Sequence, residues 1–172
     1  MRTVLYVACS VDFMIADSSG SVGFIPKRSW IRFTLYAKKK KCVLFGRRTF
    51  DMIKSAGELH RLHNTTVMVA TRRPLEPADT LLGVVRVQGS PERILAEIEK
   101  RGFRSVLLGG GANLNTQFLK AGLLDEMVFD IEPWIIGKGL PVFTGGRQKT
   151  RLQLVEARRV SGEVRLRYRV IR

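Results

Sequence analysis

Apolar segments alternate along the chain with segments in which apolar residues recur at spacings of three and four. Short β-branched runs bounded by polar or glycine-containing turns predict strands, whereas the three-and-four spacing predicts helices. Strands are expected at residues 3–10, 42–45, 65–70, 84–87, 105–108 and 126–131. Helices are expected from Pro26 to the lysines at 38–41, from Gly46 through Ile53, from Ser90 to Lys100, and from Asn113 to Ala121.

The last part of the chain departs from this alternation. Residues 152–159 and 164–171 read as two strands that pair antiparallel around a turn at Ser161 and Gly162. Strand–helix alternation followed by terminal strands indicates an α/β fold with a mixed, mostly parallel sheet. Because no internal repeat, low-complexity tract or linker interrupts the pattern, residues 1–172 are expected to form a single domain.

Composition agrees with a folded protein of a reducing compartment. Hydrophobic residues make up 45% of the 172 positions, which is enough for a core. Cys9 and Cys42 both lie in apolar stretches, so two buried thiols are expected rather than a disulfide, and no metal-ligand spacing exists. No targeting segment is evident and no apolar run approaches the ~18 residues of a membrane span. We therefore expect a cytoplasmic protein that does not enter a membrane.

The net charge of +15 is the unusual feature of the composition. A strongly positive field attracts polyanions and small anions, which raises nucleic acid as a partner. The basic residues are scattered, however, and no RNA-binding aromatic motif, zinc finger or basic tail occurs. Nucleic acid is therefore disfavoured as a partner, and a phosphate-bearing ligand accounts for part of the excess.

Three glycines follow the predicted strand that ends at Leu108. Gly109, Gly110 and Gly111 lead directly into the helix expected at Asn113. Without side chains the backbone can approach an anion closely, and a helix N-terminus presents free N–H groups to it. The turn does not follow the usual dinucleotide pattern, because Asn113 and Leu114 stand where glycine would recur. A tight turn without a ligand is the alternative interpretation.

Basic residues follow two other strands at the equivalent place. Gly46-Arg47-Arg48-Thr49 comes after one strand and Thr71-Arg72-Arg73 after another. Guanidinium groups bind phosphate through forked donors, so a single polyanionic cofactor could span several strand ends. An extra 2′-phosphate would account for the arginines, which favours NADPH over NADH. Solvated loop charges are the alternative for each pair.

Together these motifs resemble the dihydrofolate-reductase superfamily over essentially the whole chain. Gly46-Arg47-Arg48-Thr49-Phe50 is similar to the G-R-x-T-aromatic cofactor motif of that family, and residues 108–126 are similar to its second cofactor loop and helix. Glu132-Pro133 with the segment 137–143 (GKGLPVF) resembles a signature shared with the C-terminal reductase domain of riboflavin deaminase-reductases. The resemblance implies a three-layer fold with helices on both faces of the sheet.

The resemblance also implies hydride transfer from NADPH to a flat nitrogen heterocycle, a small-molecule substrate. It assigns cofactor binding to Gly46, Arg47, Arg48, Thr49, Thr71, Arg72, Arg73, Leu108, Gly109, Gly110, Gly111, Asn113 and Leu114. It assigns substrate contacts to Ala8, Asp12, Ile15, Trp30, Phe33 and Phe50. For Phe33 and Phe50, ordinary core packing is an equal alternative, and Asp12 is expected to order its loop. No metal is expected, and relatives in the riboflavin branch suggest a homodimer.

One family feature is missing. Dihydrofolate reductases carry an Asp or Glu on the first helix, but that slot falls at Trp30 or Arg28, and residues 27–41 contain no carboxylate. Asp130, on the strand before Glu132, is the proposed catalytic replacement. A carboxyl group near apolar walls would have a raised pKa, which suits proton delivery. A solvated acid at a strand end is the alternative.

Three functions remain open on the sequence. Reduction of dihydrofolate to tetrahydrofolate is favoured by the G-R-x-T-aromatic motif and the length of the chain. Reduction of the ribosylamino-pyrimidinone 5′-phosphate of riboflavin synthesis is the alternative, supported by the missing helix acid, the 132–143 signature and the basic charge. A non-catalytic basic nucleotide-binding module is the third possibility, and the intact glycine turn argues against it.

Overall fold

The central strands carry side chains that alternate between two buried faces. In β1 (Arg2–Cys9), Leu5 and Val7 join one apolar cluster, whereas Val4 and Tyr6 join another. The alternation follows from the two-residue period of a strand. Burial on both faces is expected where helices cover both sides of a parallel sheet. The computed structural model describes residues 1–145 and 149–172.

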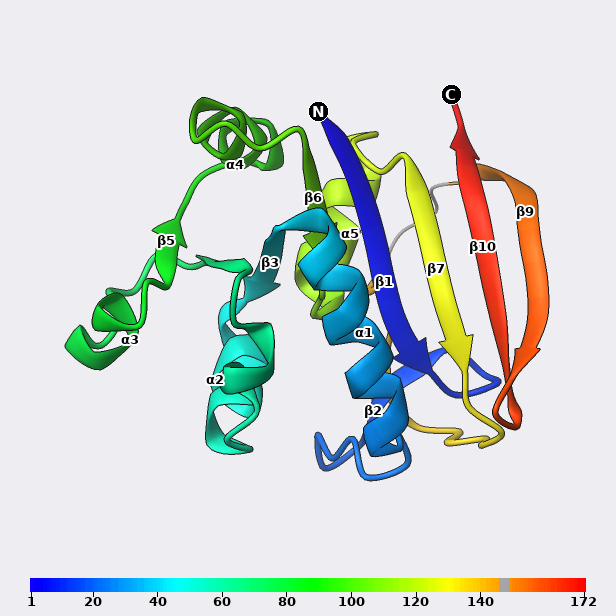
Figure 1. Cartoon of the computed structure of the whole chain (residues 1–172). Helices are drawn as coiled ribbons and strands as arrows, with labels where there is room; N and C mark the ends of the chain where they lie inside the picture. The colour runs from blue at the N-terminus through cyan, green and yellow to red at the C-terminus, as the bar shows by residue number, and fades with distance from the viewer. Residues whose placement is uncertain (146–148) are drawn as a thin grey trace.

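The main sheet has the strand order β5-β4-β3-β6-β1-β7-β10-β9 among the described residues (Figure 1). The strands other than β1 are β3 (Cys42–Gly46), β4 (Thr66–Ala70), β5 (Val85–Val87), β6 (Ser105–Leu108), β7 (Glu126–Ile131), β9 (Arg151–Val160) and β10 (Glu163–Ile171). The strands from β5 to β7 are parallel, and β10 runs antiparallel to both β7 and β9. The predicted mixed, mostly parallel sheet with a closing antiparallel pair is confirmed.

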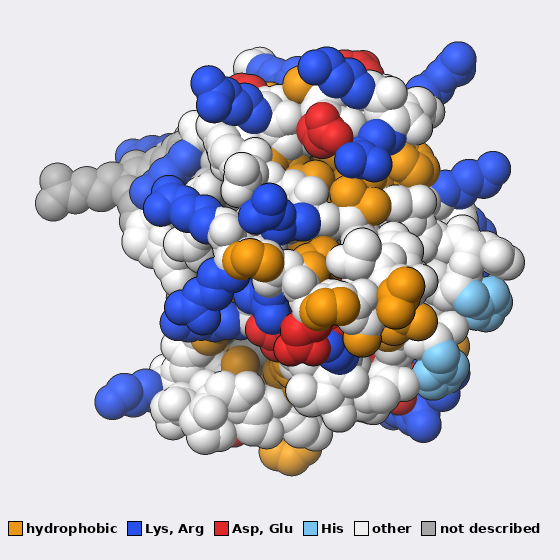
Figure 2. Space-filling view, turned by 90° about the vertical axis from the view of Figure 1, so that its left-hand side faces the viewer, with side chains coloured by type: hydrophobic (Ala, Val, Ile, Leu, Met, Phe, Trp, Pro, Cys, Tyr) orange, Lys and Arg blue, Asp and Glu red, His pale blue; other side chains and the backbone are white. Residues whose placement is uncertain are grey.

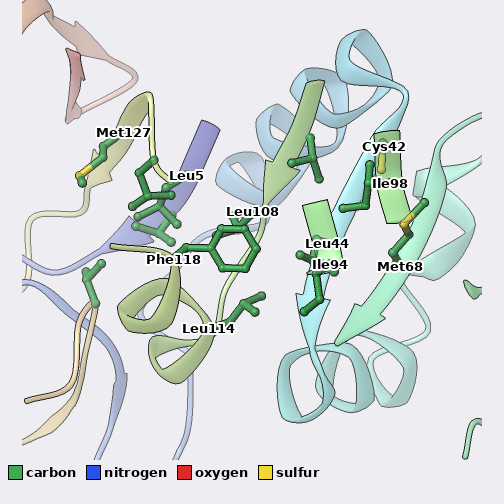
Figure 3. Close-up of a cluster of buried hydrophobic side chains, with 14 of the residues drawn as sticks. Leu5, Cys42, Leu44, Met68, Ile94, Ile98, Leu108, Leu114, Phe118 and Met127 are labelled. Atoms are coloured by element: carbon green, nitrogen blue, oxygen red, sulfur yellow. The ribbon is translucent and has the colours of Figure 1, made fainter. Parts of the chain in front are cut away.

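Helices cover both faces of this sheet and make three layers. Against one face lie α1 (Lys27–Lys40) and α2 (Arg47–Ser55), which contribute Phe33 and Phe50 to the apolar cluster there. Against the other lie α4 (Pro91–Lys100) and α5 (Ala112–Lys120). Figure 3 shows their residues Ile94, Ile98, Leu114 and Phe118 packed against β-strand residues such as Leu44 and Leu108. The three-layer α/β fold is as predicted.

Local signals set most helix boundaries. Ser90 is the N-cap of α4, and its hydroxyl accepts a hydrogen bond from the amide of Arg93. Pro26 is the N-cap residue of α1 and has an extended backbone conformation, so the helix begins at Lys27 and not at Pro26. It ends where Lys41 adopts a left-handed conformation with a φ of +60°.

Several short elements were not predicted. They are β2 (Met14–Asp17), β8 (Gly139–Pro141), the 3-10 helix η1 (Leu59–Leu62) and α3 (Pro77–Leu81). β2 and β8 form a separate antiparallel pair, in which a Cβ on Gly139 would lie 2.2 Å from the carbonyl of Ala16. Cys9 and Cys42 are buried free thiols in different strands, as expected. In the described part of the chain, no helix is long and apolar enough to span a membrane.

Candidate functional site

Two glycine-marked turns pack against each other at the carboxyl ends of β3 and β6. The amide of Gly46 donates a hydrogen bond of 2.7 Å to the carbonyl of Gly110. A Cβ on Gly111 would lie 2.9 Å from Oγ1 of Thr49, and Gly110 has a φ of +92°. The peptide bond between Gly110 and Gly111 is cis. The positive φ of Gly110 and the close approach of Gly111 to Thr49 favour glycine at these two positions.

The helices that follow these turns begin without side-chain caps. Gly46 and Gly111 are the N-cap residues of α2 and α5, and neither helix has an acidic residue in its first turn. The first amides of a helix have no acceptor within the helix, and the helix dipole makes this end positive. Two such ends side by side form a site for a negatively charged group.

A cavity of about 660 Å³ opens at these two helix ends. It extends from the start of α5 past the carboxyl ends of β3, β4 and β5. Most of the predicted cofactor residues line it: Gly46, Arg47, Arg48, Thr49, Thr71, Arg72, Gly111, Asn113 and Leu114. A cavity of this size suits a cofactor or substrate, and the lining offers both apolar and phosphate-binding groups.

The arginines of this cavity differ in whether a carboxylate of the protein already binds them. Arg47 binds Asp51 through Nε at 2.8 Å and the carbonyl of Pro74 at 3.0 Å, so it ties α2 to the turn after β4. Arg48 and Arg72 are exposed, and no carboxylate of the described chain forms an ion pair with either. Arg48 and Arg72 therefore have guanidinium groups available for an anionic ligand.

Four predicted cofactor residues do not line the cavity. They are Arg73, Leu108, Gly109 and Gly110. Leu108 is fully buried in the core, and a Cβ on Gly109 would lie 2.2 Å from the ring of Phe45. Arg73 is exposed, and its amide binds Oγ1 of Thr71 at 3.1 Å. Leu108 and Gly109 thus set the packing behind the turn, and Gly110 shapes the turn itself.

The residues predicted to contact substrate lie outside this cavity. Ala8 is half-buried at the carboxyl end of β1, and Ile15 packs against the core from β2. Trp30 stacks on Phe33 with ring centroids 5.2 Å apart, and its indole N–H donates to Glu58 at 2.9 Å. Phe50 has no exposed surface. Its prediction as a wall for the ring is wrong, because it packs in the core between α2 and the sheet.

Asp130 is buried in an ionic network, not against apolar walls. Its carboxylate accepts hydrogen bonds from Tyr6 at 2.7 Å, from Nε of Arg165 at 2.7 Å and from Nε of Arg32 at 3.3 Å. Burial alone would raise the pKa of Asp130, but the hydrogen bonds from Arg165 and Tyr6 and the two guanidinium charges together lower it. The predicted raised pKa is therefore wrong.

The network reverses the expected distribution of charge between helix and sheet. Arg28 and Arg32 come from α1, one turn apart, and both form ion pairs with the buried Glu163 at the start of β10. Glu132 is also buried and accepts a hydrogen bond from the hydroxyl of Ser29 at 2.5 Å. The helix thus supplies cations where the family pattern has an acid, and the strands supply the carboxylates.

Asp12 joins two loops, as its expected loop-ordering role requires. Its carboxylate accepts from the hydroxyl of Ser10 at 2.6 Å and from the amides of Ile136 and Gly137 at 3.1 and 2.7 Å. These three hydrogen bonds lower the pKa of Asp12 to about 2. The group is therefore a permanent anion at neutral pH.

Several residues of the region were missed by the sequence interpretation. Gln88, Gly89, Gln117, Leu140 and Thr144 also line the cavity. Gln88 and Gly89 follow β5, so the rule that ligands bind at strand ends could have found them. Arg165 lies in the closing strand, and no local signal pairs it with Asp130, which is 35 residues away in the sequence.

Comparison with known families gives a match over nearly the whole chain. The sequence model of the RibD C-terminal domain matches residues 3–166. The Bacillus subtilis (strain 168) protein YwjB, which is uncharacterised, is 25% identical over 170 residues that cover 97% of each chain. An Aquifex aeolicus protein is 28% identical over 128 residues, which cover 69% of this chain and 57% of that protein. It is named 2,5-diamino-6-ribosylamino-4(3H)-pyrimidinone 5′-phosphate reductase.

Solved structures show the same fold. A Shewanella sp. PV-4 protein with a proposed role in riboflavin biosynthesis superimposes with a TM-score of 0.86, at 24% identity and over 100% of both chains. Dihydrofolate reductase from Enterococcus faecalis, complexed with NADP(H), superimposes with a TM-score of 0.69 at 18% identity, over 98% of this chain and 96% of the reductase. The dihydrofolate-reductase-like fold predicted from the sequence is confirmed.

Proposed function

Because the chain belongs to the RibD C-terminal domain family, we propose that it is an NADPH-dependent reductase of a phosphorylated pyrimidinone. The substrate class is that of the Aquifex aeolicus relative, a ribosylamino-pyrimidinone 5′-phosphate. When bound, NADPH supplies a hydride for reduction of a C=N bond or sugar imine in this substrate. Dihydrofolate, which the sequence favoured as substrate, becomes the second candidate.

The paired glycine turns carry the cofactor part of the proposal. The space in front of Gly111 would be reduced by any Cβ, and the uncapped ends of α2 and α5 face it. We expect Thr49 and the amides after Gly46 and Gly111 to hold the diphosphate. Arg48 and Arg72 are expected to bind the 2′-phosphate and neighbouring oxygens, since neither has a carboxylate partner in the described chain.

The ionic network around Asp130 is the reason for preferring the pyrimidinone phosphate to dihydrofolate as the substrate. A pterin needs a carboxylate that is free to bind its amino-pyrimidine, and Asp130 already accepts hydrogen bonds from Tyr6, Arg32 and Arg165. Glu132 and Glu163 are buried and face Arg28. The side chain of Arg28 is 49% exposed, so its guanidinium can reach a phosphate of the substrate without leaving the network.

This arrangement gives Asp130 a role other than proton delivery. An ionised carboxylate that is held by two guanidinium groups has no proton to deliver and does not readily take one up near neutral pH. We propose that Asp130 positions Arg32 and Arg165 beside the substrate, and that water supplies the proton that accompanies the hydride. Trp30, which is half-buried and stacks on the core residue Phe33, then offers a flat apolar surface to the heterocycle.

The decisive experiment follows the nicotinamide absorbance after the protein is mixed with NADPH and one substrate at a time. We expect oxidation with the ribosylamino-pyrimidinone 5′-phosphate and none with dihydrofolate. Oxidation with dihydrofolate alone would restore the folate assignment. Saturable NADPH binding without oxidation of either substrate would favour a non-catalytic nucleotide-binding module, and no saturable binding at all would contradict the whole proposal.

A further inference from the structure

A second hollow lies at the opposite end of the sheet from the cofactor cavity. Figure 1 shows both chain termini at this end, whereas β1 and β7 point toward the other end. The hollow has a volume of about 760 Å³, and its polar lining consists of Arg2, Arg104, Arg169, Arg172, Asp125 and Glu126. Nothing in the proposed reaction uses these residues.

The carboxylates of the hollow are already neutralised. Arg2 forms an ion pair with Glu126, which is 5% exposed, and Arg172 binds Asp125 at 2.9 Å. Asp125 also accepts a hydrogen bond of 2.7 Å from the amide of Thr3. The two acids are therefore occupied, and they hold Arg2 and Arg172 at the wall of the hollow.

Two arginines remain without acidic partners. Arg104 and Arg169 are both exposed, and no carboxylate of residues 1–145 or 149–172 forms an ion pair with either of them. Cations thus exceed carboxylates in the hollow, and the excess charge faces solvent.

The strand order and register of the sheet set the distance between the backbones of Arg104 and Arg169. Arg104 precedes β6, Arg2 opens β1 opposite Ser105, and Arg169 on β10 lies opposite Glu126 on β7. Three strand spacings separate β6 from β10 in the order β6-β1-β7-β10. Across the strands this separates their backbones by ~14 Å, at ~4.8 Å for each spacing. Arg169 is level with Val4, whereas Arg104 lies one residue before the level of Arg2, which adds ~10 Å along the strands. The two backbones are therefore ~17 Å apart. Two arginine side chains that extend from these strands into the hollow, and not toward each other, would bracket a group longer than one phosphate.

We propose that this hollow is a second anion site, which binds a chain of linked phosphate groups such as that of a nucleoside triphosphate. The guanidinium groups of Arg104 and Arg169 each take a phosphate through forked hydrogen bonds, and Arg2 supports the middle of the chain. The site is separate from the cofactor cavity and does not depend on the proposed reductase activity.

The test is isothermal titration of the intact protein with inorganic tripolyphosphate, ATP and a single-stranded oligonucleotide in separate runs. The cofactor cavity also has phosphate-binding groups, so the site is identified with variants. The double variant Arg104→Gln/Arg169→Gln should weaken tripolyphosphate and ATP binding at least ~10-fold, because each lost guanidinium removes charge-assisted hydrogen bonds. NADPH binding of this variant should not change. The control Arg158→Gln/Arg159→Gln removes the same charge from β9 and, at ~0.15 M salt, should bind tripolyphosphate as the wild type does.

A second measurement, the Tm, distinguishes loss of the site from poor folding of the double variant. Tripolyphosphate should raise the Tm of the wild type and of the β9 control, but not that of Arg104→Gln/Arg169→Gln, since a ligand stabilises only the state that binds it. Equal affinities for the wild type and the double variant would overturn the proposal, as would equal losses in both double variants. Binding of the oligonucleotide alone would also overturn it, because an extended basic surface would then replace a compact site.

Discussion

The carboxylate of Asp130 receives hydrogen bonds from side chains of three different elements. Tyr6 comes from β1, Arg32 from α1 and Arg165 from β10. A buried ion pair contributes little net stability when complete, but removal of one partner leaves an uncompensated charge inside the protein. Removal of Asp130 would therefore leave Arg165 without a carboxylate ion-pair partner in the described chain, and Arg32 with Glu163 alone.

Asp130→Asn should lower the free energy of unfolding by about 3–5 kcal/mol at neutral pH, because the largely buried guanidinium of Arg165 loses its counter-charge and that of Arg32 keeps only Glu163. Urea denaturation measures the loss. Asp51→Asn is the matched control, since Asp51 is half-exposed and pairs with Arg47 one helical turn away. Its cost should stay below ~1 kcal/mol. Equal costs for the two variants would mean that the network around Asp130 is not ionic.

The same carboxylate predicts a pH dependence with a definite sign. Its pKa is lower in the folded protein than in the unfolded chain, so the stability that it contributes is present above the unfolded value of ~3.9. That contribution is lost as pH falls through the folded value. The gap in unfolding free energy between the wild type and Asp130→Asn should therefore be constant from pH 5 upward and shrink below ~pH 4. A gap that grows on acidification would show the opposite shift.

Gly111 makes a prediction about the cofactor cavity. Gly111→Ala would place a Cβ 2.9 Å from Oγ1 of Thr49 and into the space before α5. We expect the Kd for NADPH to rise at least ~10-fold, because loss of ~1.4 kcal/mol of binding free energy is enough for that change. Fluorescence titration measures it. Gly23→Ala is the control, since its Cβ would meet only Ser21 at 3.4 Å and NADPH affinity should not change.

At the residue scale, the sequence identified residues whose role follows from their own backbone conformation. It did not identify residues whose role depends on partners that are distant in the sequence. Gly46 and Gly111 could be found because glycine before a helix has a local meaning. The pKa of Asp130 was predicted with the wrong sign, because Arg32 and Arg165 are 98 and 35 residues away in the sequence. Phe50 fits a ring wall or a core position equally well until its surroundings are known.

At the scale of elements, the pairing of β2 with β8 brings two loops together beside the cavity. Asp12 holds this unit through the amides of Ile136 and Gly137, and Val11 donates to the carbonyl of Trp134 at 2.8 Å. Leu140 in β8 lines the cofactor cavity. The position of this cavity wall therefore depends on a carboxylate in another loop.

Asp12→Ala should release the second loop. We expect hydrogen exchange at the amides of Ile136 and Gly137 to accelerate at least ~10-fold, since hydrogen bonds to a charged acceptor contribute ~1.5–3 kcal/mol. NMR exchange rates measure it. Asp17→Ala is the control, because Asp17 binds Ser19 and Ser21 within its own loop. Protection that is unchanged in Asp12→Ala would show that β2 and β8 alone hold the two loops together.

The long elements were predictable because each carries its own periodic signal. β6 and β7 have the bounds that the apolar runs indicated, and Ser90 marked the start of α4. β2 and β8 were not predictable in this way. Each is short, and their pairing follows from the close contact of Gly139 with Ala16, which no local pattern encodes.

At the scale of the whole molecule, positive charge extends well beyond the three arginines that line the cofactor cavity (Figure 2). The net charge is +15, and Figure 2 shows Lys and Arg side chains spread over the face that it presents. Only a few of these residues can touch any one ligand. The others act through the long-range field, which brings an anion to the surface faster but does not hold it once it is bound.

This distinction predicts how salt acts on NADPH binding. The association rate should fall at least ~10-fold between 0.01 M and 0.15 M salt, because the Debye length shortens from ~30 Å to ~8 Å and distant charges cease to act. Stopped-flow fluorescence measures this rate. Arg158→Gln/Arg159→Gln, far from the cavity on β9, should slow association at 0.01 M and have no effect at 0.15 M. Arg48→Gln, which lines the cavity, should weaken binding at both concentrations, since it loses a contact as well as field. An association rate that is independent of salt would mean that the charge excess has no part in ligand capture.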